Sequence, residues 1–181
     1  MNFFGEVFGQ ITVETPKFHL LKKTALFEVR RYSSGLWASV SMPGETVSGG
    51  SGFQTLANYI FGSNSGKETI AMTAPVLTQN NRMTFILPSA FKSLQDLPRP
   101  NTRQVELSSV PNLTVAALQF SGSTSDEVVA EQERRLREYI SQDEKIRFRE
   151  DASVFLARYN APWTIPFYRT NEVMLQVDLL E

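Results

Sequence analysis

The sequence of 181 residues contains no cysteine and a single histidine, His19. Without cysteine, the chain can form no disulfide, no thiolate metal site and no cysteine nucleophile. A hydrolytic triad or a zinc site needs histidines that neighbouring groups orient, and His19 stands alone in the lead segment before the first expected strand. These absences argue against the commonest hydrolase and zinc-protein classes.

The sequence also lacks an excess of charge of one sign and a long apolar run. Its 18 basic and 19 acidic residues give a net charge of −1. A nucleic-acid-binding protein is typically basic, with clustered Lys and Arg, so we expect no nucleic-acid partner. No apolar stretch approaches the roughly 20 residues that cross a bilayer, so we expect no membrane span.

The N-terminal lead, residues 1–20, is apolar at its start but has no basic leader and contains Glu6, so it does not resemble a secretory signal. Phe3, Phe4, Val7 and Phe8 recur at helical spacing, which fits either an amphipathic docking segment or a helix packed on the domain. A membrane-surface helix would carry Lys or Arg, so we expect packing on the domain. We expect a cytoplasmic protein, or a plastid one if a transit peptide has been removed.

What is present is a repeat. Residues 36–42 and 114–120 both alternate apolar with small or polar side chains, which predicts strands, and a shorter strand-like piece precedes each at 27–29 and 105–107. Phe27 and Val105 are 78 residues apart, as are Ala38 and Ala116. A helix is predicted to follow each pair of strands, over 53–61 and from about 124 to 141. Further strands are predicted at 69–76 and 154–163, and closing strands at 83–87 and 172–177.

Two details of the repeat are also predicted. The third strands both end in Ala-Pro, at Pro75 and Pro162, which are 87 residues apart, so about nine extra residues are expected between helix and strand in the second half. On the outer face of the second helix, Glu131 with Arg135 and Glu133 with Arg137 are expected to pair, after a capping box at 124–127.

The predicted fold is α+β, in a single domain of residues 1–181 with repeats at about 21–88 and 104–181. Each repeat reads strand–strand–helix–strand–strand. One half cannot bury its sheet alone, so the two are expected to join with pseudo-two-fold symmetry. The product is a distorted antiparallel β-barrel flanked by two helices.

Catalytic candidates are few. Gly49 to Gly52 precede a helix but lack the residues of a phosphate loop, so they indicate a flexible helix entry. Four glutamates stand in or beside strands, and a buried one could act as a general acid or base. Strand carboxylates are usually exposed or paired, and we favour that interpretation here. The four are Glu28, Glu68, Glu106 and Glu172.

Several segments from Glu14 to Val177 resemble the SOUL heme-binding family. They are ETPKF (14–18) with FEVRRY (27–32), GFQTLANYIFG (52–62), IAMTAPV (70–76), and RYNAP (158–162) with RTNEV (169–173). The resemblance implies a distorted β-barrel with two helices, in agreement with the repeat. It also implies reversible, non-covalent binding of heme or another tetrapyrrole in an apolar groove beside the first helix, for transport or buffering rather than turnover.

The resemblance also suggests the site. Some animal members carry a histidine, suggested as an iron ligand, where this chain has Arg31, so we expect no dedicated histidine axial ligand. Arg31, Lys67 or Arg169 would pair with the propionates. The expected binding residues are Arg31, Phe53, Gln54, Ala57, Asn58, Ile60, Phe61, Lys67 and Arg169.

Three functions therefore stay open. The first, which we favour, is a non-enzymatic tetrapyrrole carrier. The second is a small-molecule hydrolase or isomerase on the same twin-repeat fold, which requires a buried glutamate in a cleft. The third is an interaction module for a protein partner in heme metabolism, with incidental heme binding.

Overall fold

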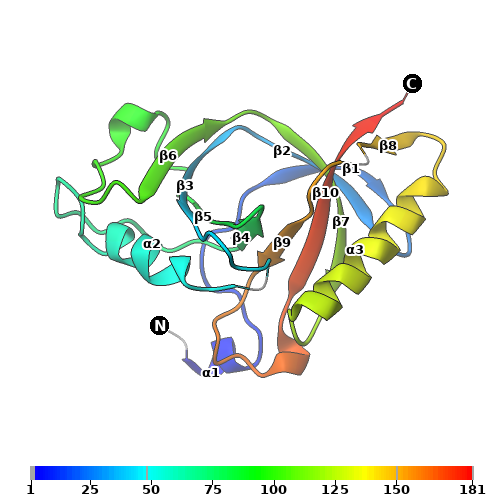
Figure 1. Ribbon diagram of the computed structural model, residues 1–181, viewed down its shortest axis with the longest axis horizontal. Coiled ribbons are helices and arrows are strands. Elements are labelled where there is room, and N and C mark those ends of the chain that lie inside the picture. Colours follow the sequence, from blue (N-terminus) through cyan, green and yellow to red (C-terminus); the bar gives the residue numbers. More distant parts are fainter. Residues whose placement is uncertain (1–2, 48, 150, 181) are drawn as a thin grey trace.

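The computed structural model describes residues 3–47, 49–149 and 151–180, and Figure 1 shows the arrangement of their helices and strands. In chain order the elements are α1 (Phe3–Val7), β1 (Phe18–Lys23), β2 (Glu28–Tyr32), β3 (Gly35–Ser41), α2 (Gly52–Ile60), β4 (Val76–Gln79), β5 (Arg82–Ile86), η1 (Leu94–Asp96), β6 (Val105–Val110), β7 (Leu113–Phe120), α3 (Asp126–Ser141), β8 (Ile146–Phe148), β9 (Phe155–Arg158), η2 (Pro166–Tyr168) and β10 (Asn171–Leu179).

The strands form one curled antiparallel sheet in the order β1-β2-β7-β10-β9-β4-β5-β3-β6, with β8 paired to β10. The helices α2 and α3 flank it on either side of the molecule (Figure 1). The predicted α+β fold, a distorted antiparallel barrel flanked by two helices, is therefore confirmed. None of the helices in the described part of the chain is both long and apolar enough to cross a membrane.

The strand register shows the pseudo-two-fold symmetry directly. Glu28 pairs with Ala117 between β2 and β7. Shifting these two positions by the repeat offset of 78 gives Glu106 and Ser39, which pair between β6 and β3. All five pairs of the β2–β7 ladder map onto pairs of the β3–β6 ladder in this way. The offset that the sequence predicts is thus the offset of the structure.

The symmetric crossing point lies where β2 passes into β3 and β6 passes into β7. Both long strands break there, at residues 33–34 and 111–112, and the Ser34 backbone N–H donates a hydrogen bond of 2.7 Å to the Asn112 side chain. Beyond the crossing, strand β2 of the first repeat pairs with β7 of the second, and strand β6 of the second repeat pairs with β3 of the first. Val29 of β2 is buried with α3, whereas Val105 of β6 is buried with α2.

The prediction that the two Ala-Pro pairs occupy equivalent positions is wrong. Strand β4 begins directly after Pro75, whereas β9 ends at Arg158, before Pro162. Residues 69–75 make only isolated bridges, at Thr69 and Thr73, instead of the expected strand. A shared dipeptide does not determine the register of a strand, which depends on its pairing with neighbouring strands and on the side chains that it buries.

The extra residues of the second half consequently lie elsewhere than predicted. Residues 80–81 connect β4 to β5, but residues 159–170 connect β9 to β10. The insertion is therefore between two paired strands, and not between helix and strand. It forms the loop that contains η2.

Three groups of buried side chains fill the molecule, because alternate residues of each strand face opposite sides of the sheet. One packs under α2, one under α3, and the third lies on the sheet face away from both helices. They include Leu36, Ala38, Leu56, Ile60 and Phe85; Val29, Ala116, Leu136, Ile140 and Leu175; and Leu77, Val115, Ala117, Phe155 and Met174, respectively.

The surface of α3 follows the prediction in part. Arg137 pairs with Glu133 at 2.7 Å as expected. Glu131, however, pairs with Arg134 at 2.9 Å, while Arg135 donates to the Tyr139 hydroxyl at 3.1 Å. The closer arginine and the competing phenol explain the change. The Ser125 side chain at the N-cap makes no capping hydrogen bond, so the predicted capping box is absent here.

Candidate functional site

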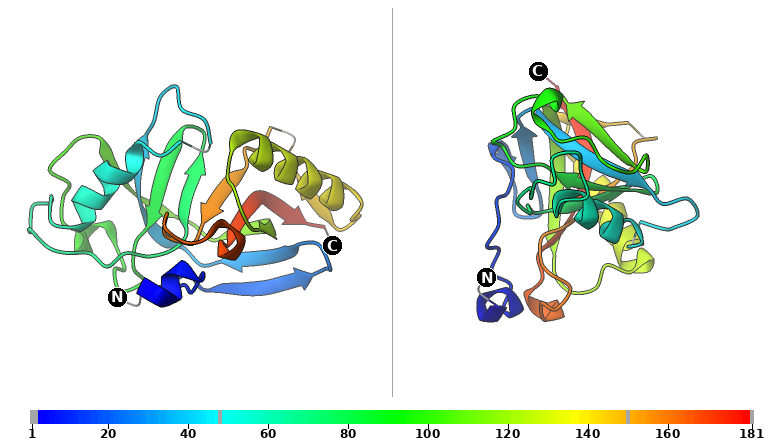
Figure 2. Two further views of the ribbon diagram at one scale, coloured as in Figure 1. Left: turned by 90° about the horizontal axis from the view of Figure 1, so that it is seen from below. Right: turned by 90° about the vertical axis from the view of Figure 1, so that its left-hand side faces the viewer.

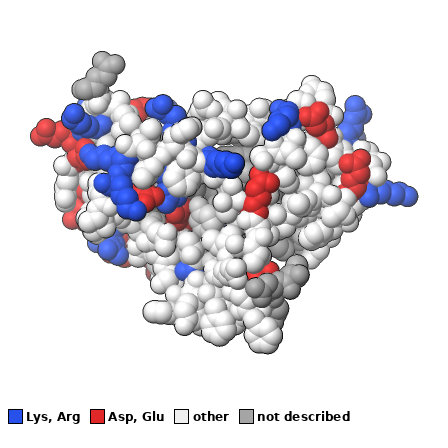
Figure 3. Space-filling view, turned by 180° about the vertical axis from the view of Figure 1, so that it is seen from behind, with Lys and Arg blue, Asp and Glu red and all other residues white. Residues whose placement is uncertain are grey.

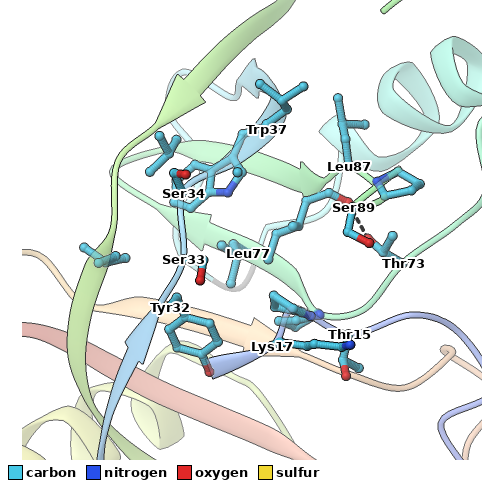
Figure 4. A pocket seen from close by; sticks show the side chains of 18 of the residues that line it. Thr15, Lys17, Tyr32, Ser33, Ser34, Trp37, Thr73, Leu77, Leu87 and Ser89 are labelled. Atoms are coloured by element: carbon cyan, nitrogen blue, oxygen red, sulfur yellow. Dashed lines mark hydrogen bonds between the residues drawn. The ribbon is translucent and has the colours of Figure 1, made fainter. Parts of the chain in front are cut away.

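A cavity of about 750 Å³ lies on the sheet face away from α2 and α3. It opens at the crossing point of the two repeats, where the two strand breaks at 33–34 and 111–112 leave the sheet without a continuous ladder. Figure 4 shows side chains converging on it from strands, turns and the N-terminal segment. The lining includes Lys17, Tyr32, Trp37, Leu77, Ile86, Phe91, Lys92, Leu113, Val115, Phe155, Tyr159 and Met174.

The two repeats contribute residues at equivalent positions to the cavity wall, but the side chains at these positions differ in size. The repeat offset of 78 relates Trp37 to Val115 and Leu77 to Phe155. The two large aromatics meet on one side, with Trp37 and Phe155 edge to face at 6.2 Å between ring centroids. The smaller Leu77 and Val115 leave the space. An apolar cavity of this size suits a flat hydrophobic ligand.

The rim of the cavity is polar and basic. Lys17 and Lys92 both line it and both are exposed. Between them, Glu14 accepts a hydrogen bond of 3.0 Å from the Ser89 backbone N–H. Hydrogen bonds from Ser89, with smaller contributions from the two lysines, lower the pKa of the Glu14 carboxyl. Two ammonium groups beside an apolar cavity are suited to the carboxylates of an otherwise apolar ligand.

Behind the cavity wall lies a buried ionic network. Arg30 donates to both carboxylate oxygens of Glu172, at 2.8 and 3.0 Å, and the Tyr159 hydroxyl donates to Glu172 at 2.7 Å. Burial, then the nearby Glu172 charge, raises the pKa of Tyr159 above its usual range. For Arg30, burial disfavours the charge, but the hydrogen bonds and charge of Glu172 outweigh it and raise the pKa. Glu172 thus holds the Arg30 guanidinium in its charged form despite burial.

None of the four glutamates has the setting of a free general base. Glu172 is 2% exposed but neutralised by Arg30. Glu28 pairs with Lys23 and Arg30, and Glu106 with Arg82. Glu68 is exposed. This agrees with the favoured interpretation that the strand carboxylates are exposed or paired.

The residues predicted on α2 lie outside the cavity, and only some of them are at the surface. Ala57 and Ile60 face the core and are 5% and 1% exposed. Phe53 and Phe61 are 41% and 63% exposed at the two ends of the helix. Between them the Gln54 amide donates to Asn58 at 2.7 Å.

The three predicted cationic partners lie apart from one another. Arg31 is exposed on β2, where its Nε donates to the Thr114 hydroxyl at 3.4 Å. Lys67 is exposed in the loop after α2. Arg169 donates to the carbonyls of Thr164 and Pro162, both at 2.9 Å. Among the lining residues of the described cavity, none of the nine predicted site residues occurs.

The cavity residues were not selected from the sequence, although a signal for them exists. Tyr32 to Ser34 and Val110 to Asn112 stand at the repeat offset of 78, and each triplet interrupts a strand. A break repeated at the same position in both halves marks a shared opening. The family resemblance indicated the first helix, α2, instead.

The described residues contain no group of three or more His, Asp or Glu side chains that could hold a metal ion. His19 lies on β1, is exposed, and does not belong to the described cavity lining. The cavity phenols are already engaged, since Tyr159 donates to Glu172 and Tyr32 accepts from Arg30 at 3.3 Å. The described lining of the cavity therefore offers no histidine to a metal-bearing ligand.

Comparison with known proteins gives consistent results. A family model described as SOUL heme-binding protein matches residues 13–176. Heme-binding protein 2 of Homo sapiens is 29% identical over 162 residues, which cover 82% of this chain and 77% of that protein. Heme-binding protein 2 of Mus musculus is 28% identical with the same coverage.

Solved structures share the fold at much lower identity. The C-terminal domain of EcmrR has a TM-score of 0.56 at 13% identity and covers 84% of this chain and 96% of its own. A hydrolase from Listeria innocua has a TM-score of 0.60 at 11% identity and covers 87% and 94%. At these identities the similarity shows the fold alone.

Proposed function

Because the chain belongs to the SOUL heme-binding protein family, we propose that it binds heme or another tetrapyrrole reversibly, for transport or buffering and without turnover. The observation that carries the proposal is the cavity of about 750 Å³ with aromatic walls and two lysines at its rim. A tetrapyrrole is a flat apolar ring with carboxylates at its edge. Its ring would lie against Trp37 and Phe155, and its carboxylates would meet Lys17 and Lys92.

The surface of α2 is the second proposed location for the same ligand. It offers two exposed phenylalanines, Phe53 and Phe61, and Lys67 beyond the helix. We favour the cavity because it encloses apolar surface on several sides, whereas the α2 surface offers one convex face. Hydrophobic stabilisation scales with the area removed from water, and an enclosed ring loses more.

The lining supports binding without a dedicated axial ligand. The cavity contains no histidine, and its phenols are held by Glu172 and Arg30. The affinity would come from the ring and the carboxylates, not from the iron. Non-catalytic binding is supported by the same network, since Glu172 is neutralised by Arg30 and is not available to move a proton.

The test is a titration with hemin and, separately, with protoporphyrin IX. We expect a saturable shift of the Soret band and quenching of Trp37 in a Trp163→Phe variant, which leaves Trp37 as the only tryptophan. Similar affinities for the two ligands would support binding without an axial ligand. The absence of saturation with either ligand would overturn the proposal.

Matched double variants locate the site. Lys17→Gln with Lys92→Gln should weaken hemin binding by roughly tenfold, as expected from losing two partly exposed ion pairs. Phe53→Ser with Phe61→Ser should leave it unchanged. The reverse pattern would move the site to α2 while keeping the tetrapyrrole function.

A further inference from the structure

The N-terminal helix and the loop inserted between β9 and β10 together form a protruding apolar surface, which we name the aromatic knob. Figure 1 and the right-hand view of Figure 2 show α1 and η2 side by side, projecting below the sheet. The knob consists of Phe4, Phe8, Trp163, Ile165, Phe167 and Tyr168, which are 79%, 59%, 50%, 40%, 78% and 45% exposed.

The knob is built firmly onto the domain. The Ile165 backbone N–H donates to the Val7 carbonyl at 3.1 Å, and the Thr164 hydroxyl donates to the Glu6 carbonyl at 2.7 Å. The rings of Phe8 and Tyr168 meet edge to face at 5.6 Å. The expectation that the N-terminal segment packs on the domain is therefore confirmed, but Phe4 and Phe8 remain largely exposed.

The charged side chains near the knob, Glu6 and Arg169, are engaged in hydrogen bonds. Glu6 accepts hydrogen bonds from the Trp163 indole and the Thr12 hydroxyl, both at 3.3 Å. Arg169 is held by two backbone carbonyls. In the space-filling view of Figure 3 the lower lobe is accordingly almost free of charged side chains. Contiguous exposed apolar surface of this kind marks an interaction site.

The shape and order of the side chains indicate a lipid bilayer as the partner. The knob is convex, so it would enter a soft surface. The most exposed members are phenylalanines, and Trp163 and Tyr168, which carry polar ring atoms, are less exposed. Tryptophan and tyrosine prefer the headgroup level of a bilayer, while phenylalanine reaches the acyl chains. The six side chains of the knob are uncharged, so a charged protein surface would find no ion-pair partner among them.

The knob is also continuous with the cavity. The chain leaves the knob at Val13 and forms the cavity wall from Glu14 to Lys17. On the other side Tyr159 lines the cavity, and the next residue, Asn160, donates to the Gly9 carbonyl at 3.0 Å. Docking by the knob would bring the cavity rim near the surface in which an apolar ligand dissolves.

We propose that the aromatic knob docks this protein on lipid bilayers, through insertion of Phe4 and Phe167 and without dependence on anionic lipid. The docking needs no bound tetrapyrrole. Lysine and arginine strengthen binding to anionic membranes, and the knob offers none that is free to do so. It should therefore bind neutral vesicles, and any gain on anionic ones would come from lysines outside the knob, such as Lys17 and Lys92 at the cavity rim.

The experiment uses the full chain with phosphatidylcholine vesicles. A Trp37→Phe variant leaves Trp163 as the only tryptophan and thus as a reporter inside the knob. We expect the protein to float with the vesicles, with a blue shift of Trp163 emission and protection from acrylamide. Phe4→Ser with Phe167→Ser should lower the partition coefficient at least tenfold, because two largely exposed rings lose their apolar surface.

The control removes the same number of exposed phenylalanines elsewhere. Phe53→Ser with Phe61→Ser on α2 should leave partitioning unchanged, and circular dichroism should show that both double variants are folded. Absence of flotation at millimolar lipid, or flotation insensitive to Phe4→Ser with Phe167→Ser, would overturn the proposal. A concentration-dependent dimer that this knob variant abolishes, without vesicle binding, would instead assign the surface to a second copy. Hemin titration without vesicles tests the proposed function separately.

Discussion

The two halves of the molecule share one framework but use it differently. The first half closes β4 onto β5 with Asn80 and Asn81 alone, whereas the second half places residues 159–170 between β9 and β10. The first half carries a short helix with exposed phenylalanines, and the second a long helix laced with ion pairs. The shared framework creates the cavity at the crossing point, and the unshared loop creates the aromatic knob. The cavity therefore depends on what the two repeats share, and the aromatic knob on where they differ.

The comparison is sharpest at Glu172 of β10 and Arg82 of β5, which stand at equivalent register positions because Ala116–Leu175 and Ala38–Phe85 are equivalent pairs. Glu172 is buried with Arg30, while Arg82 pairs with Glu106 at the surface. Glu172→Ala should lower the free energy of unfolding by about 3–5 kcal/mol, since it leaves a buried arginine unpaired. Arg82→Ala should lower it by less than about 1 kcal/mol.

Urea unfolding of both variants measures this difference. Equal losses of unfolding free energy in the two variants would contradict the idea that the Arg30–Glu172 pair is buried and the Arg82–Glu106 pair is not. A variant that replaces Arg30 and Glu172 together by Met and Leu should recover much of the loss, because it leaves no buried charge without a partner.

The short hairpin of the first half offers a second way to test the comparison. Asn80 and Asn81 have φ values of 49° and 55°, as a two-residue hairpin turn requires. Asn81→Val should destabilise the protein by about 1–2 kcal/mol, because a β-branched residue is strained in this region. Thermal unfolding reports the change. Thr170→Val in the long connection serves as control, and a loss there as large as that of Asn81→Val would remove the distinction.

The smallest expected effect concerns acid stability. Glu28 and Glu106 are equivalent in the repeat. For Glu28, burial raises the pKa, but hydrogen bonds from Lys23 and Arg30 outweigh it, so the folded-state pKa is lowered from the ordinary 4.5. A lowered folded pKa gives stability that is present above pH 4.5 and is lost as the pH falls through the folded value.

Glu28→Gln should therefore flatten the decline of stability below about pH 4.5 by less than about 1 kcal/mol. Denaturant titrations at pH 7 and at pH 3 measure it. Glu106→Gln, at the surface pair with Arg82, is the matched variant. An unchanged pH slope in Glu28→Gln would show that the inner pair contributes nothing to acid stability.

Much of the fold could be predicted because it depends on periodicity. Alternation in residues 36–42 and 114–120, with its offset of 78, fixed the strands and their symmetry. The two Ala-Pro dipeptides gave a wrong alignment of the repeats, because Pro75 precedes β4 whereas Pro162 follows β9. Only the strand pairing in the structure shows this difference. For the site, α2 has an apolar stripe that any helix on a sheet requires.

The cavity and the knob escaped prediction for physical reasons. The cavity depends on which strands lie apart at the crossing point, and Trp37 looks like any alternating strand residue in the sequence. The knob depends on contacts between residues more than 150 positions apart, such as Thr164 with Glu6. Even the exposure of Phe4 and Phe8 is set by that long-range packing.

The exchange of β2 and β6 between the halves has a consequence for how the chain folds. Each repeat completes the core of the other, so neither is an independent folding unit, even though each has its own helix. Their docking must wait for pairings that span most of the chain, which slows folding and makes unfolding a single cooperative event. A cut in the connector between β5 and β6 would leave two fragments that acquire structure only by association. The chain with its two repeats is, in this sense, a dimer whose subunits share one covalent chain.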